Sequence, residues 1–268
     1  MDWIWLLSYL ALGAITGVFA GLLGVGGGGI MVPVLTMMFA AQGFNPEHKV
    51  HLALGTSMAA IVPTAIASAR AHHLRGGVVW PAVRGLAPGV LLGTFAATFV
   101  ASFLSGIPLA IFFAVFMSAV ALYMMIGKPP HADRILPGPV GLGAVGSGIG
   151  GVSALVAIGG GSLTVPFLVW CNVPMARAVG TSAAVGLPIA AAGAAGYIVN
   201  GWGLSGLPSH TLGFVVWPAV LAMALMSFIT APLGARLAHR LPVATLKRVF
   251  AVVMVLLAVK MLHGVLVG

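Results

Sequence analysis

Long apolar stretches without a charged residue dominate the chain. Four such stretches extend over residues 3–46, 85–127, 135–176 and 178–235. A helix needs about 20 apolar residues to cross the hydrocarbon core of a bilayer, so each stretch is long enough for two crossings. The pattern therefore predicts an all-α polytopic membrane protein.

Glycine clusters, prolines and polar loops divide these stretches into ten candidate helices. Two of them, 29–42 and 162–172, are short, and at most about 21 Å long, so we expect them to begin inside the membrane. The other candidates cover 3–24, 52–71, 78–104, 107–126, 138–158, 179–199, 212–236 and 244–266. The sequence thus predicts about 8 to 10 membrane segments.

The two halves of the chain repeat the same motifs in the same order. The matched pairs are GGGGIMVP at 26–33 with GGGSLTVP at 159–166, LGTS at 54–57 with VGTS at 179–182, Pro63 with Pro188, and VWP at 79–81 with VWP at 216–218. Internal duplication is common in secondary transporters, whose sites lie where the repeats meet. We therefore predict a first transmembrane repeat at 1–127, a linker loop at 128–137 and a second repeat at 138–268.

The distribution of Lys and Arg favours one orientation of these repeats. If the short helices complete a crossing, only Lys49 and Lys260 of the 12 Lys and Arg residues lie on one side of the membrane, and if they turn back the division is even. Cytoplasmic loops carry an excess of Lys and Arg, so the biased division is preferred. It predicts inverted repeats, with a cytoplasmic linker and both termini on the non-cytoplasmic side.

Composition excludes several classes of function. The chain is 60% hydrophobic and 6% charged, and its net charge of +9 is scattered over short loops, which argues against a nucleic-acid partner. The three acidic residues, Asp2, Glu47 and Asp133, lie in terminal or loop segments, so we expect no carboxylate at membrane depth. No HExxH or similar motif suggests a metal, a cofactor or an enzyme. The expected partners are membrane lipid and a small anion, and a homo-oligomer stays open.

The motifs resemble those of the sulfite exporter TauE/SafE family. The resemblance rests on GLLGVGGGGIMVPVL at 21–35, GVSALVAIGGGSLTVPFL at 151–168 and the Gly-Thr-Ser that opens the next helix in each half, and it covers essentially the whole chain. It implies a permease for sulfur-containing anions such as sulfite and short organosulfonates, often an exporter, in the bacterial cell membrane. At 153–158 the chain has SALVAI where the family often has Ser-Gly-x-x-Gly-Ile.

The two glycine runs, here called the first glycine break (26–29) and the second glycine break (159–162), are the candidate binding elements. Each exposes successive N–H groups at the positive end of a helix dipole, which attracts anions. Hydroxyl pairs add uncharged donors, and in inverted repeats each break meets the hydroxyl pair of the other half. With Ser153 taken from the resemblance, the candidates are Gly27, Gly28, Gly29, Thr56, Ser57, Ser153, Gly160, Gly161, Ser162, Thr181 and Ser182.

Structural alternatives stay open for each of these residues. The glycines could serve only for close helix packing, as we expect for those that recur every fourth residue at Gly13, Gly17 and Gly21 and at Gly85, Gly89 and Gly93. The hydroxyls could bond to backbone groups. Lys49 and Arg177 could draw anions toward the pathway or only set the topology.

The function that fits these observations is secondary transport of a small sulfur-containing oxyanion by alternating access, with export as the expected direction. Two alternatives belong to other classes: a membrane subunit that transports nothing and assists a partner, and an intramembrane enzyme. The enzyme alternative lacks a cluster of acids, bases or metal ligands with suitable spacing.

Overall fold

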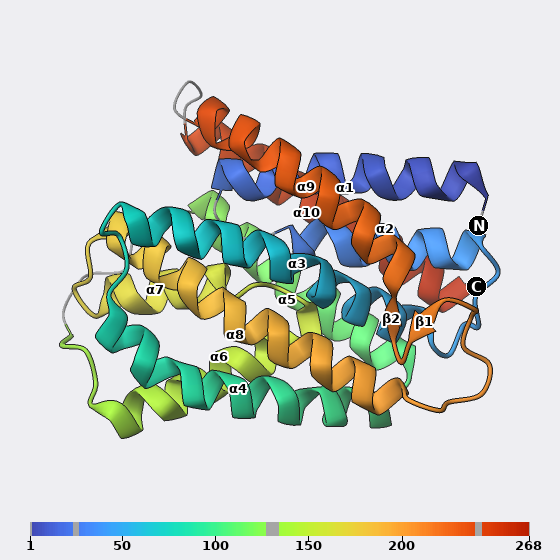
Figure 1. The fold of residues 1–268 in the computed structure, drawn as a ribbon, viewed down its shortest axis with the longest axis horizontal. Helices are drawn as coiled ribbons and strands as arrows, with labels where there is room; N and C mark the ends of the chain where they lie inside the picture. Colours follow the sequence, from blue (N-terminus) through green and yellow to red (C-terminus); the bar gives the residue numbers. More distant parts are fainter. Residues whose placement is uncertain (1, 24–26, 127–133, 239–242, 268) are drawn as a thin grey trace.

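A computed structural model describes residues 2–23, 27–126, 134–238 and 243–267 of the chain. In these residues it contains ten helices and one short hairpin (Figure 1). The elements are α1 (Trp3–Leu23), α2 (Gly28–Ala41), α3 (Lys49–Leu74), α4 (Trp80–Phe103), α5 (Gly106–Ile126), α6 (Pro139–Val156), α7 (Gly161–Trp170), α8 (Met175–Gly201), β1 (Thr211–Leu212), β2 (Val215–Val216), α9 (Trp217–Ala238) and α10 (Val243–Val267).

The structure confirms the all-α polytopic class and the ten expected helices, with one difference. We expected a helix from residue 212, but α9 begins at Trp217, and the preceding residues form an antiparallel pair in which Thr211 faces Val216. Gly213 turns the chain there with a φ of 54°, which favours glycine. The apolar Val215 and Val216 extend the hydrophobic pattern of α9 without being helical.

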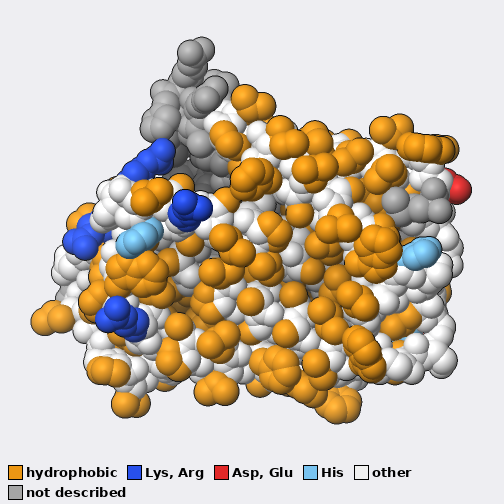
Figure 2. Space-filling view, viewed as in Figure 1, with side chains coloured by type: hydrophobic (Ala, Val, Ile, Leu, Met, Phe, Trp, Pro, Cys, Tyr) orange, Lys and Arg blue, Asp and Glu red, His pale blue; other side chains and the backbone are white. Residues whose placement is uncertain are grey.

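Seven of the described helices are long and apolar enough to cross a membrane: α1, α3, α4, α5, α6, α8 and α10. The helices α2 and α7 are apolar but shorter, as is the apolar segment Trp217–Leu233 of α9. Hydrophobic side chains cover most of the face in Figure 2, and charged ones lie near its ends. The chain is therefore an integral, multi-pass membrane protein.

Equivalent helices of the two halves run in opposite directions. The third helices, α3 and α8, pack against each other so that Gly55 contacts Tyr197 and His72 contacts Gly180, which makes them antiparallel (Figure 1). This is the relation expected for inverted repeats. The predicted linker at 128–137 lies mostly outside the described residues, so the boundaries of the two repeats stay predictions.

Each half also packs its outer helices against the other half. Residues on α1 meet residues on α9 in parallel order, Gly13 against Met223 and Gly17 against Ser227, with the backbones in direct contact. The equivalent pair is α4 with α6, where Gly89 contacts the backbone of Gly143. Because hydrocarbon lipid gives helices no hydrophobic reason to associate, small residues that allow close packing stabilise such interfaces.

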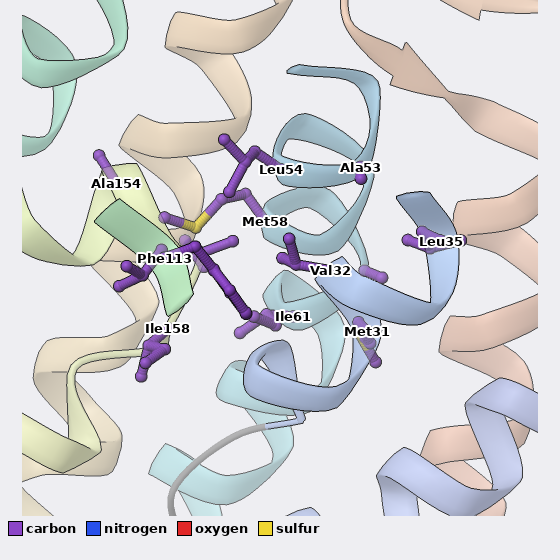
Figure 3. Close-up of a cluster of buried hydrophobic side chains, with 14 of the residues drawn as sticks. Met31, Val32, Leu35, Ala53, Leu54, Met58, Ile61, Phe113, Ala154 and Ile158 are labelled. Atoms are coloured by element: carbon purple, nitrogen blue, oxygen red, sulfur yellow. The ribbon is translucent and has the colours of Figure 1, made fainter. Parts of the chain in front are cut away.

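The core of the molecule lies where α2 and the end of α6 meet α3. Figure 3 shows Met31 and Val32 of α2, Met58 and Ile61 of α3, and Ile158 after α6 within one apolar cluster. All of these side chains are buried. Both glycine breaks border this cluster, so the irregular backbone is enclosed by protein, as a bilayer requires.

Positive charge gathers at one end of the molecule. Arg70, Arg75, Arg84 and Arg177 belong to the end where α3 stops and where α4 and α8 begin, here called the basic end (Figure 2). Lys49 belongs to the opposite end, where α3 begins and where the hairpin lies. The positive-inside rule favours a cytoplasmic basic end.

The glycine seam between α4 and α6 predicts a difference between two neighbouring substitutions. At Gly150 an added Cβ would lie 2.5 Å from the carbonyl oxygen of Val90, whereas at Gly148 nothing lies within 4 Å. We expect Gly150→Ala to lower the free energy of unfolding by about 1–3 kcal/mol through overpacking. Gly148→Ala is the matched control and should raise it by about 0.5–1 kcal/mol, because alanine favours a helix more than glycine does. Denaturant unfolding of both variants in detergent tests this, and equal stabilities would contradict the seam.

The orientation predicts which loops face the cytoplasm. Cysteines would be introduced at Arg75 and Ser205, which lie at opposite ends, with Cys171 changed to alanine. Burial raises the pKa of the Cys171 thiol, so its contribution to labelling is small, and the substitution removes it. In intact cells a membrane-impermeant maleimide should label Ser205→Cys and spare Arg75→Cys until the cells are opened. The reverse pattern would place the basic end outside.

Candidate functional site

Both short helices begin inside the molecule directly after a glycine break. The carbonyl of Gly27 accepts hydrogen bonds from the N–H groups of Ile30 and Met31 at 3.1 and 3.0 Å. The carbonyl of Gly160 accepts equivalent bonds from Leu163 and Thr164 at 3.2 and 2.8 Å. Gly160 has a φ of 79°, so a residue with a side chain would be strained there. Gly26 lies outside the described residues.

The two breaks approach each other at the centre. Gly28 is in close contact with the carbonyl oxygen of Ala157, which ends α6 just before the second glycine break. No side chain fits at Gly28 in this arrangement, so close packing explains this glycine. Ala157 itself has a φ of 48° and stands where the family resemblance expects glycine. A left-handed conformation costs a residue with a Cβ about 1–2 kcal/mol.

Side chains of α3 and α8 cover both breaks. A Cβ atom added at Gly28 would lie 3.2 Å from the Cδ1 atom of Ile61, and one added at Gly159 would lie 3.5 Å from the Cγ2 atom of the same residue. On α8, Ile189 covers Gly160, with its Cδ1 atom 2.5 Å from the Cβ position of that glycine. Ile61 therefore separates the two breaks, and a ligand that reached both would displace it.

The serines of the two hydroxyl pairs lie on the helix faces that reach the breaks. Ser57 precedes Ile61 by one turn on α3, and Ser182 precedes Gly186, which packs against the carbonyl of Gly159, by one turn on α8. Both serines are buried, and their hydroxyls have no hydrogen-bond partner among the described residues. Because α3 and α8 are antiparallel, the serines flank the breaks from opposite ends. Ser57 lies about 6 Å along its helix from Ile61, and Ser182 lies about 10 Å along its helix from Ile189.

The threonines of the same pairs join the two halves. The hydroxyl oxygen of Thr56 accepts a hydrogen bond from the N–H of Val216 at 3.0 Å, and that of Thr181 accepts one from Val79 at 2.9 Å. Thr181 also donates to the carbonyl of Arg177 at 2.7 Å. Each Thr-Ser motif therefore holds the Val-Trp-Pro motif of the other half. Both hydroxyls already bond to backbone groups, which is the structural alternative for these residues. Anion binding by Thr56 and Thr181 stays a prediction.

The two candidate cations lie at opposite ends of the molecule. Lys49 is buried, and its Nζ donates to the carbonyl of Gly264 in the last turns of α10 at 3.2 Å. A cation there complements the negative end of the α10 dipole. Arg177 is exposed at the start of α8 and belongs to the basic end. Only Arg177 therefore presents its charge to an approaching anion.

Hydrogen-bond donors collect at the second glycine break. The hydroxyls of Ser153, Ser162 and Thr164 are buried, and no described residue pairs with them. Thr164 is fully buried, and its Oγ1 lies 3.3 Å from the Cβ position of Gly160. Within the described ranges, no acceptor bonds to the N–H groups of Gly161 and Ser162. Buried polar groups are rarely left without partners, so such a cluster indicates a polar ligand.

Sequence reasoning missed Thr164, Ile61 and Ile189. Thr164 lies inside the quoted motif GGGSLTVP, where the first half has Met31, and this difference between the halves was the available signal. The two isoleucines carry no signal, because any apolar residue in a helix looks alike until its neighbours are known. Their importance comes from packing between distant segments.

Comparison with known proteins finds a family model and several relatives that cover most of the chain. The family model described as sulfite exporter TauE/SafE matches residues 9–261. A probable membrane transporter protein of Haemophilus influenzae is 37% identical over 258 residues, which cover 96% of this chain and 97% of that protein. One of Methanocaldococcus jannaschii is 27% identical over 249 residues, 87% of this chain and 86% of that protein. No solved structure matches the chain.

The bonds made by the two threonines predict a loss of stability without a change of shape. Thr56→Val and Thr181→Val keep the side-chain volume but leave a backbone N–H without its acceptor, so each should lower the free energy of unfolding by about 1–3 kcal/mol. Thr56→Ser and Thr181→Ser, which keep the hydroxyl, are the controls and should retain most of the wild-type free energy of unfolding. Unchanged unfolding of the valine variants in detergent would show that these bonds do not join the halves.

Proposed function

The chain belongs to the sulfite exporter TauE/SafE family and is a membrane transporter, and we propose that it exports small sulfur-containing oxyanions, sulfite or short organosulfonates, by alternating access. The single observation that supports this proposal is the pair of buried hydroxyls of Ser57 and Ser182, which lie on either side of the converging breaks and have no hydrogen-bond partner in the described part of the chain. The proposed location is the bacterial cell membrane.

An anion inside a membrane needs hydrogen bonds in place of its water shell, because an uncompensated buried charge is very costly. Ser57, the second glycine break and Ser182 offer such donors. None of these groups carries a formal charge. Hydroxyls and amides bind an oxyanion through several moderate bonds, and this allows release on the other side, whereas a buried Arg would hold it as an ion pair.

Alternating access requires that the cover over the breaks opens toward one end at a time. Ile61 on α3 and Ile189 on α8 are the covering side chains, and their helices are equivalent members of the two repeats. A movement of α3 relative to α8 would therefore uncover the breaks toward one end, and the opposite movement toward the other. Inverted repeats provide two such conformations from one architecture.

The charge distribution supports export. Arg70, Arg75, Arg84 and Arg177 belong to the basic end, which we place in the cytoplasm. A surface with this potential raises the local concentration of anions and their rate of entry. The opposite end has Lys49 already bonded to α10. An anion is therefore attracted at the cytoplasmic end and released where the attraction is weaker.

A transport assay tests the proposal directly. Purified protein in proteoliposomes should carry radiolabelled sulfite, and Ser57→Ala or Ser182→Ala should each lower the initial rate about 10-fold or more, as loss of a hydrogen bond to a charged group predicts. Ser102→Ala, which removes an exposed hydroxyl at the end of α4, is the control and should transport normally.

Normal rates in both serine variants would refute the pathway. Absence of flux by the wild-type protein, tested with sulfite and methanesulfonate, would favour the alternative of a subunit that transports nothing. Gly28→Leu does not test anion binding, because a side chain at that position displaces the Ala157 carbonyl and disturbs the packing itself.

A further inference from the structure

The two glycine breaks differ in backbone and in side chains: Gly27 has a φ of −77°, whereas the equivalent Gly160 has a φ of 79°. Three pairs of equivalent positions differ in the same sense, with an apolar residue in the first half and a hydroxyl in the second: Ala20 and Ser153, Gly29 and Ser162, and Met31 and Thr164. The last pair also has equivalent geometry. The Cε atom of Met31 lies 3.4 Å from the Cβ position of Gly27, and the Oγ1 atom of Thr164 lies 3.3 Å from that of Gly160.

Most side chains around Gly27, Gly28 and Gly29 of the first glycine break are apolar. A Cβ at Gly29 would lie 3.4 Å from both the Sδ atom of Met117 and the Cε atom of Met254, and both methionines are buried. With Met31, they place side chains that donate no hydrogen bonds beside the break. The hydroxyl of Thr16, whose side chain also lies against Gly27, already donates to the carbonyl of Leu12 at 2.8 Å. The carbonyl of Ala157 against Gly28 adds a partial negative charge, which disfavours an anion there.

The surroundings of the second glycine break are polar and unpaired. The buried hydroxyls of Ser162 and Thr164 and the N–H groups of Gly161 and Ser162 have no partner in the described part of the chain. These four donors belong to the first turn of α7, whose dipole is positive at that end. Three oxygens of a sulfonate group could accept bonds from them.

On the basis of the proposed function, we propose that the second glycine break binds the oxyanion head of the substrate and that the first glycine break binds its apolar part. The protein then selects substrates that carry an oxyanion group at one end and an apolar group at the other. A sulfonate with a short alkyl group satisfies both breaks. Sulfate places a fourth oxygen among methionines without a donor, so it is rejected. Sulfite binds through its head alone.

Calorimetric titration of the purified wild-type protein with methanesulfonate, ethanesulfonate, propanesulfonate, sulfite and sulfate tests this division. Each added CH2 group should tighten binding about four-fold, as burial of a methylene predicts. Sulfite should bind more weakly than methanesulfonate, and sulfate should give no binding at concentrations where sulfite binds.

Two variants separate the breaks. Thr164→Val should weaken all three sulfonates and sulfite by the same factor, about 10-fold or more, and leave the four-fold increment per CH2 unchanged. Met254→Gln, close to methionine in shape, should reduce the increment and leave sulfite binding intact, which also shows that the variant is folded. Thr94→Val is the matched control for the first variant, because Thr94 also has a buried hydroxyl without a described partner but lies on α4 against Gly150.

The outcomes distinguish this inference from the function on which it rests. If sulfite and the sulfonates bind, but with no dependence on chain length or with no effect of Thr164→Val, the division between the breaks is wrong and anion transport stands. If Met254→Gln abolishes sulfite binding while Thr164→Val changes only the increment, the assignment is reversed. If the wild-type protein neither binds nor transports sulfite or any sulfonate, the proposed function itself fails.

Discussion

The whole arrangement depends on the rule that a backbone inside a membrane must have its polar groups paired or enclosed by protein. Two helices of this chain begin inside the molecule, at Gly28 and Gly161, and their first turns would be unstable against lipid. The antiparallel helices α3 and α8 enclose them, with Ile61 and Ile189 placed over the glycines. At the second glycine break, the N–H groups of Gly161 and Ser162 are enclosed by protein but have no partner among the described residues.

Neither half could provide this enclosure alone. The start of α4 is held by Thr181 of the second half, and the start of α9 follows a residue held by Thr56 of the first. The outer helices α1 and α9 also pair across the halves. Each half therefore completes the other, and the alternating access that we propose would involve elements of both halves.

The elements were predictable from the sequence because glycine runs, prolines and charged loops mark their ends. The direction of individual side chains was not. Thr56 and Ser57 are adjacent and chemically similar, yet one bonds to Val216 and the other lies on the face that leads to Ile61. Lys49 bonds to Gly264, far away in the sequence. Such roles depend on contacts between distant segments, whereas hydropathy describes each segment by itself.

Because the two halves are repeats, residues at equivalent positions can be compared directly. In a transporter built from inverted repeats, the two halves exchange roles between the two conformations, so both halves need a similar fold. Its substrate has no such symmetry. Buried side chains at equivalent positions stay alike in one case, Met117 and Met254, and differ in another, Met31 and Thr164. In the division of the breaks that we propose, the difference between Met31 and Thr164 matches a substrate with one apolar and one polar end.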